Sequence, residues 1–301
     1  MLSTEAISTK SPSRLILSCL RILGAAVALL GTLQAQEGAD YITENPFVTE
    51  GYAQLQAGNT DSALEAFDKA LETNANELSA LLGQAMIYAS NQEHERAFVS
   101  YDSITQSYPR HIDAWNGRGL AAFNLEDFDE ALSSFERATA DQPINGFYYE
   151  SLAWTLMCRG EFEKAAETAK TSTLMYGRKG ESPIYPLLIA YFAYVETGDM
   201  ASAKGTLKYA DKNRQVNQWP SPVVDYLMDR IDHDKLISFV MDTAQETEAH
   251  TYIGLKLRKA QELERSEKHL HWVSNSGDPR VFEYTLARAL KMQNSVAVLA
   301  P

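Results

Sequence analysis

The sequence predicts an all-α fold, in which pairs of antiparallel helices stack side by side as a right-handed α-solenoid with a C-terminal capping helix. Three observations lead to this prediction. Similar residues recur every 34 positions, and each 34-residue unit contains two amphipathic stretches joined by a short turn. In two of the units a proline follows the second stretch. A helical repeat of this length buries its apolar side only against neighbouring repeats.

The composition is that of a folded, acidic protein. The chain has 301 residues, of which 45% are hydrophobic and 22% are charged, so it can build a sizeable core. It carries 27 basic and 40 acidic residues, a net charge of −13. This excess of acid argues against a non-specific nucleic-acid binder and against a protein held by anionic lipids, because both depend on lysine and arginine.

The first 35 residues are predicted to be a secretory signal peptide. Lys10, Arg14 and Arg21 precede an apolar run at residues 22–33, and Ala35 is the small residue before the expected cleavage position. This interpretation places the mature protein in an exported location, the periplasm or cell envelope of a bacterium.

Two alternatives for this segment stay open. Residues 15–33 are long enough for an uncleaved membrane anchor, although Arg21 makes spanning costly. Cys19 lies in a partial lipoprotein box, which makes lipidation the other alternative. After removal of residues 1–35, Cys158 is the only cysteine. It is expected to be a packing residue, and an intramolecular disulfide is excluded.

The 34-residue period starts after a short linker at residues 36–43 and runs through five units in residues 44–212. The third unit shows it best, with a first helix over residues 112–125 and a second over residues 127–140. Small residues between the two helices allow a close approach, and aromatic residues fill the neighbouring gaps. The residues predicted to pack the repeats are Ala63, Ala97, Trp115, Gly119, Ala131, Phe135, Ala165 and Ala203.

The period is lost after the fifth unit. Residues 213–246 are predicted to be an irregular helical insertion, with short helices near 223–231 and 234–244. Residues 247–292 follow as a degenerate unit, at about 247–277, and a helix at about 279–291. This last helix is expected to close the open end of the stack, because an uncapped solenoid exposes its apolar side. Residues 293–301 form a tail.

The third unit resembles the tetratricopeptide repeat (TPR). Its residues read Trp115-x3-Gly119, then Phe128-x2-Ala131-x3-Phe135-x2-Ala138-x4-Pro143. The resemblance covers about residues 44–290 and is weaker in the first and fourth units. Residues 219–290 are also similar to the tail of exported bacterial TPR proteins, loosely NlpI-like, through motifs such as Trp219-Pro220-x-Pro222 and His271-Trp272-Val273.

Membership of the TPR family implies a concave groove, lined by the first helix of each pair, in which a protein or peptide partner binds. The residues that the resemblance assigns to this groove are Tyr52, Leu82, Met86, Asn116, Leu120, Phe123, Glu150, Trp154, Met157, Tyr185 and Phe192. They are mostly apolar and include no lysine or arginine, so a basic clamp for a peptide carboxylate is not expected. An apolar peptide or an amphipathic helix fits better. Self-filling stays open, by residues 36–46, the C-terminal tail or a second copy.

Each candidate catalytic motif in the sequence is better explained by a structural role. His94-Glu95 is not followed by a histidine at zinc-protease spacing, and residues 117–122 mimic a dinucleotide motif without a preceding strand. We therefore expect no catalytic residues, no cofactor, no metal and no nucleic acid.

The predicted function is that of an exported, non-enzymatic scaffold or adaptor. One alternative is a membrane-anchored envelope assembly factor or lipoprotein. Another is a metal-dependent enzyme whose site would use the polar residues Asp225, Asp229, Asp232, His233 and Asp234.

Overall fold

A computed structural model describes residues 45–216 and 218–299, and within the last helix it describes side chains as far as Leu290. The predicted signal peptide at 1–35, its anchor and lipidation alternatives, and the linker at 36–43 lie outside the described residues. Among the described residues, no helix is both long and apolar enough to span a bilayer.

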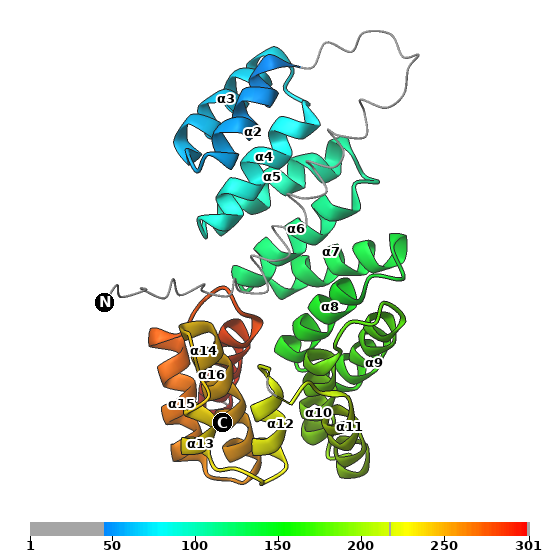
Figure 1. The fold of residues 1–301 in the computed structure, drawn as a ribbon, viewed down its shortest axis with the longest axis vertical. Helices are drawn as coiled ribbons and strands as arrows, with labels where there is room; N and C mark the ends of the chain where they lie inside the picture. Colours follow the sequence, from blue (N-terminus) through cyan, green and yellow to red (C-terminus); the bar gives the residue numbers. More distant parts are fainter. Residues whose placement is uncertain (1–44, 217, 300–301) are drawn as a thin grey trace, which may run out of the picture.

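The described residues form fifteen helices and no strand. Ten of them make five antiparallel pairs that follow one another along the chain (Figure 1). The paired helices are α2 (Pro46–Gln56) with α3 (Thr60–Thr73), α4 (Leu78–Ser90) with α5 (His94–Ser107), α6 (Ile112–Asn124) with α7 (Phe128–Asp141), α8 (Gly146–Arg159) with α9 (Phe162–Arg178), and α10 (Ile184–Thr197) with α11 (Met200–Asn213). This arrangement confirms the predicted α-solenoid.

Small residues bring the helices of each pair together. The alanines at the 34-residue positions (Ala63, Ala97, Ala131 and Ala165) have no exposed surface, nor does Ala203. A methyl group added at Gly119 would lie 2.7 Å from the ring of Phe135, so the ring occupies the space that any larger side chain would need. Trp115 is half-buried, and its indole N–H donates to the carbonyl of Pro109 at 2.9 Å.

Polar contacts join one pair to the next. The guanidinium of Arg118 in α6 lies 2.7 Å from Asp102 in α5 and 2.7 Å from Glu130 in α7, and it stacks over the ring of Phe98. The start of α7 is capped by Asp127, whose carboxylate accepts from the N–H of Glu130. Asp127, Asp129 and Glu130 therefore lie where their negative charge favours the start of the helix.

The C-terminal region is less regular. Two short helices, α12 (Ser221–Leu227) and α13 (His233–Ile237), lead into a hairpin of α14 (Thr243–Lys259) and α15 (Leu263–Ser276). The last helix, α16 (Phe282–Leu299), runs beyond residue 291, where the sequence pattern predicts its end. The extension follows from the chain itself, because residues 292–299 contain no proline or glycine to stop a helix.

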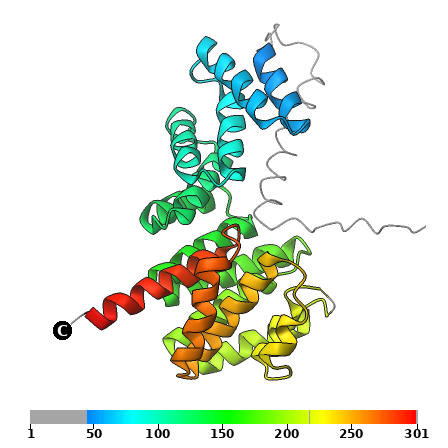
Figure 2. The ribbon, with the colours of Figure 1, turned by 90° about the vertical axis from the view of Figure 1, so that its left-hand side faces the viewer.

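The position of α16 differs from the expected cap at the end of the stack. The hairpin α14–α15 does not continue the stack of pairs; it folds back, and α16 packs against α8 in the middle of the solenoid (Figures 1 and 2). Aromatic residues determine this position, since Phe282 in α16 contacts the rings of Phe123 and Trp154. The end formed by α11 contacts α12 instead.

Candidate partner-binding face

We call the eleven predicted groove residues, carried by α2, α4, α6, α8 and α10, the A face. The structure divides this face into two parts. α14 and α16 lie against α8 and α10, whereas α2 to α4 lie at the opposite end of the molecule (Figures 1 and 2). One part is therefore covered by the chain itself, and the other is not covered by these C-terminal helices.

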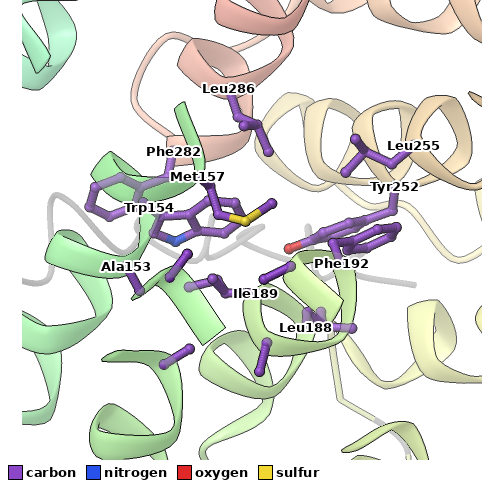
Figure 3. Packing of buried hydrophobic residues seen from close by; sticks show 14 of the residues in the cluster. Ala153, Trp154, Met157, Leu188, Ile189, Phe192, Tyr252, Leu255, Phe282 and Leu286 are labelled. Atoms are coloured by element: carbon purple, nitrogen blue, oxygen red, sulfur yellow. The ribbon is translucent and has the colours of Figure 1, made fainter. Parts of the chain in front are cut away.

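Phe282 is the centre of the covered part. Its ring stacks on Trp154 with 6.0 Å between centroids and an interplanar angle of 8° (Figure 3). It also meets Phe123 edge-on, with 5.1 Å between the ring centroids. Phe147 lies 6.3 Å away on a third side. Trp154 keeps 2% of its surface exposed, so α16 shields this aromatic group from solvent. Met157, on the next turn of α8, is buried in the same cluster.

α14 covers the neighbouring part of the face. Tyr252 stacks on Phe192 with 5.7 Å between ring centroids, and its hydroxyl donates to the carboxylate of Glu283 in α16 at 2.5 Å. Burial, followed by the nearby Glu283, raises the pKa of the Tyr252 hydroxyl well above its usual value. The hydroxyl therefore stays protonated and remains a donor to Glu283.

Two more predicted groove residues hold the covered part together. Tyr185 in α10 donates its hydroxyl hydrogen to Glu248 in α14 at 2.9 Å, and the indole of Trp219 donates to the same carboxylate at 2.7 Å. Glu150 in α8 is buried and accepts from the hydroxyl of Tyr176 at 2.7 Å. Both carboxylates are thus used inside the molecule.

Six of the predicted groove residues therefore lie in an internal interface rather than on an open surface. They are Phe123, Glu150, Trp154, Met157, Tyr185 and Phe192. The helical period shows which side of each first helix is apolar. It does not show which segment covers that side, and here the segment is α14 with α16.

The other part of the A face belongs to α2, α4 and the first turns of α6. Tyr52 is buried and donates to the carbonyl of Ser79 at 2.9 Å, which joins α2 to α4. Leu82 is half-exposed, whereas Met86 and Leu120 are buried. In this part, Leu82 is therefore the predicted groove residue that offers apolar contact area.

Asn116 stands out in this part because it is buried without a partner. Its side chain is 2% exposed, and its amide oxygen accepts no hydrogen bond from the described residues. It lies three residues after Asp113 and four before Leu120, so the three share one side of α6. Asp113 is already engaged, because it accepts from the hydroxyl of Tyr148 at 2.7 Å. The unpaired oxygen is thus an acceptor left over on the A face.

A shallow, open cavity of about 650 Å³ marks the boundary between the two parts, and no pattern in the sequence indicates it. Its lining residues are Leu125, Glu126, Asp127, Phe128, Asp129 and Arg159. Glu126 also pairs with Arg288 of α16 at 2.5 Å. The cavity is therefore acidic and lies where α16 meets the turn between α6 and α7.

The polar residues of the alternative enzyme site have structural partners. Asp225 lies 2.6 Å from Arg214, Asp229 lies 2.6 Å from Lys256, and Asp232 caps α13 by accepting from the N–H of Lys235 at 2.8 Å. Within the described residues, no three histidine, cysteine or acidic side chains are grouped in a way that would hold a metal ion.

Comparison with known proteins gives the same repeats. Residues 48–112 and 112–145 each match a family model of the tetratricopeptide repeat. The chain is 25% identical over 141 residues to cilia- and flagella-associated protein 70 of Homo sapiens, covering 46% of this chain and 12% of that protein. It is 25% identical over 114 residues to the heat-shock cognate co-chaperone sgt12 of Aspergillus fumigatus, covering 38% of this chain and 33% of that protein. The chain thus spans a third or less of these relatives.

Solved structures share the fold at low identity. A tetratricopeptide repeat protein from Parabacteroides merdae is 14% identical, with a TM-score of 0.57 over 81% of this chain and 98% of its own. YrrB, a TPR protein with an unusual peptide-binding site, is 17% identical, with a TM-score of 0.54 over 64% of this chain and 93% of its own. The family-model matches over residues 48–145 and the stacked helix pairs support a protein of the tetratricopeptide repeat family, and these structures share its fold.

Proposed function

We propose that this protein is an exported, non-enzymatic scaffold that binds a protein partner on the part of the A face formed by α2, α4 and the start of α6. The fold supports a role in protein interaction, and YrrB has a peptide-binding site on the same fold. The covered part of the face is filled by α14 and α16, so the partner contacts the remaining part.

The observation that carries this proposal is the unpaired amide oxygen of Asn116. A buried polar group without a hydrogen bond costs about 1–3 kcal/mol, so an acceptor of this kind needs an explanation. The oxygen has no accessible surface in the free chain, so a backbone N–H of a partner would satisfy it after a change of the Asn116 rotamer. Asn116 lies one repeat period after Leu82, so the acceptor and an apolar contact share one column of the face.

The partner is therefore expected to present a peptide backbone together with apolar side chains. One backbone N–H reaches the oxygen of Asn116, and apolar side chains contact Leu82 and the half-exposed Leu55. Arg118, the basic residue nearest to Asn116 in sequence, is held by Asp102 and Glu130, so it does not recruit an acidic group.

Site-specific cross-linking tests this proposal. A photoreactive benzoylphenylalanine is incorporated at the position of Leu82 and, as a matched control, at the position of Val99, which is exposed on the second helix of the same pair. We expect a discrete protein adduct from position 82 and none from position 99. Equal adducts from both positions, or none from position 82, would contradict the assignment of the face.

Replacement of the acceptor separates binding from folding. Asn116→Leu keeps the approximate size of the side chain and removes the unpaired oxygen. We expect the free energy of unfolding to rise by about 1 kcal/mol while the adduct at position 82 weakens. A variant that loses stability would show that Asn116 serves the fold, and a more stable variant with an unchanged adduct would show that its oxygen does not contact the partner.

Export is part of the proposal and rests on residues 1–35. Mass spectrometry of the protein from its natural source would measure the first residue of the mature chain. A chain that starts at Gln36 supports cleavage of a signal peptide. A retained apolar segment, or a lipid on Cys19, supports the anchored alternative instead.

A further inference from the structure

Two histidines from neighbouring helices meet in the C-terminal hairpin. The Nδ1 atoms of His250 in α14 and His269 in α15 are 2.9 Å apart. The ring of His250 stacks on Trp272, with 4.2 Å between the ring centroids. A third histidine, His233 of α13, lies with its ring centroid 6.2 Å from that of His269. Three helices therefore bring imidazoles together at one place.

The distance between the two Nδ1 atoms limits the protonation state of the pair. A hydrogen bond between them requires one Nδ1 to carry a proton and the other to lack one, so at most one of the two rings is charged. A first added proton would occupy Nε2 of the donor ring and place a charge in a half-buried site. A second would place two N–H donors opposite each other and break the contact between His250 and His269.

The surroundings of His250 and His269 disfavour the protonated, charged form of each ring. Burial, followed by the neighbouring His269, lowers the pKa of His250 from 6.5 to about 4. Burial, followed by His233 and Arg265, also lowers the pKa of His269. His233 lies 3.3 Å from the exposed carboxylate of Asp234, which belongs to the same short helix.

The buried carboxylates of the hairpin and of α16 serve other contacts. Glu248 accepts from Tyr185 and Trp219 on the side of α10, and Glu283 accepts from Tyr252. These groups also take up protons when the solution becomes acidic, so a test must separate them from the histidines.

The histidine pair is connected to α16 through Trp272. This ring stacks on His250 and packs against the apolar cluster of Leu270, Val273 and Ala287, which joins α15 to α16. The hairpin also holds the start of α16 directly, because the hydroxyl of Thr251 donates to the carbonyl of Glu283 at 3.3 Å. A change in the pair therefore acts on the segment that covers the aromatic part of the A face.

We propose that the pair of His250 and His269 is an acid-sensitive latch. It keeps the hairpin of α14 and α15, together with α16, packed over the aromatic part of the A face, and it releases these three helices on protonation. The inference rests on the proposed function in one respect, namely that exposure of this part gives a partner access to Trp154 and Phe192. The release itself is a property of the chain alone and requires no partner.

The sign of the pH dependence follows from proton uptake. In the released state each imidazole binds a proton near its ordinary pKa of about 6.5, whereas the closed state binds it only at lower pH. The closed state is thus fully stable above pH of about 6.5 and loses stability as the pH falls toward 4. Protonation of His250 alone shifts the equilibrium between the closed and the released state toward release by at most about 20-fold when the pH falls from about 7 to about 5. The partial exposure of His250 makes the shift smaller.

Cys158 provides a built-in reporter of release. It lies in α8, is buried, and belongs to the same apolar cluster as Trp154 and Phe282. In the full chain with Cys19→Ser it is the only thiol. We would measure its reaction rate with dithiodipyridine in EDTA at neutral pH and at about pH 5. Dividing each rate by that of the urea-unfolded protein at the same pH removes the intrinsic pH dependence of the thiol.

We expect the normalised rate to rise several-fold in acid while the helix content measured by circular dichroism is unchanged. The control His271→Asn, an exposed position on α15, should behave in the same way. His250→Asn combined with His269→Asn keeps an amide donor and acceptor near the Nδ1 positions but cannot titrate, so acid should not accelerate its reaction. His269→Asn alone should lose most of the acceleration, which provides a second variant if the double variant fails to fold.

Three results would overturn the latch. They are a chain whose Cys158 reaction is not accelerated by acid, a folded double variant that keeps the acceleration, and acceleration that accompanies general loss of helix. Cross-linking from the position of Leu82 at neutral pH does not involve these histidines. Failure of the latch and failure of the proposed function are therefore separate results.

Discussion

Gly117 and Gly205 both lie inside helices, but their surroundings differ. A methyl group added at Gly117 in α6 would lie 2.5 Å from the ring of Tyr101, which fills the space between α5 and α6. At Gly205 in α11 a methyl group would meet no atom within 4 Å. The first glycine therefore sets the distance between two helices, whereas the second only weakens its own helix.

This contrast gives a prediction at the scale of single residues. Gly117→Ala should lower the free energy of unfolding by about 1–3 kcal/mol, because the added methyl forces Tyr101 out of its position. Gly205→Ala should raise the free energy by about 0.5–1 kcal/mol, because alanine is the better helix former. Urea denaturation of the two variants measures both effects, and equal changes would show that packing at Gly117 does not differ from open surface.

At the scale of helices, α16 packs on the solenoid through Phe282, and Leu286, Ala289 and Leu290 are buried in the same apolar cluster. Phe282 contacts rings from both α6 and α8, and Arg288 adds an ion pair with Glu126 at the turn of the third pair. A partly exposed ion pair contributes little, typically less than about 1 kcal/mol. The docking of α16 therefore depends on its apolar contacts, among which Phe282 is the largest side chain.

We predict that Phe282→Ala undocks α16 without unfolding the five helix pairs. Loss of a buried phenylalanine costs about 3–5 kcal/mol, so the opening of α16 should become at least about a hundredfold more frequent. Hydrogen exchange should accelerate in α16 and stay unchanged in α3 and α5. Met241→Ala, whose side chain is 88% exposed, is the matched control and should change neither. Unchanged exchange in α16 of the Phe282 variant would show that other contacts hold it.

The sequence predicts the helix pairs well because their packing is local. Phe135 fills the space at Gly119 within one unit, so a single period contains the information. The cover over the A face depends on contacts between distant segments, such as Phe282 with Trp154, and no spacing relates them. The histidine pair is similar, since His250 and His269 lie on different helices and meet only in the folded hairpin. The unpaired oxygen of Asn116 also requires the structure, because a sequence does not show which polar groups lack partners.

For the whole molecule, the two ends of the solenoid differ in how they are supported. α2 and α3 have one neighbouring pair and a small apolar cluster around Phe67. The first helices α8 and α10 have neighbours on both sides and are also covered by α14 and α16, within one cluster that extends from Leu120 to Leu290. In a solenoid, stability is close to a sum of such neighbour terms, so the N-terminal pair should open first.

Hydrogen exchange under native conditions tests this gradient. We expect protection to be lowest in α2 and α3 and highest in α8 and α10, with opening of the first pair at least about tenfold more frequent. Phe67→Ala should remove protection from α2, α3 and the neighbouring part of α4, because Phe67 contacts Tyr52 and fills the space at Gly51 and Gly83. It should leave α8 and α10 unchanged, because their residues belong to a different apolar cluster. If Phe67→Ala lowered protection equally in α10, the chain would unfold as one cooperative unit.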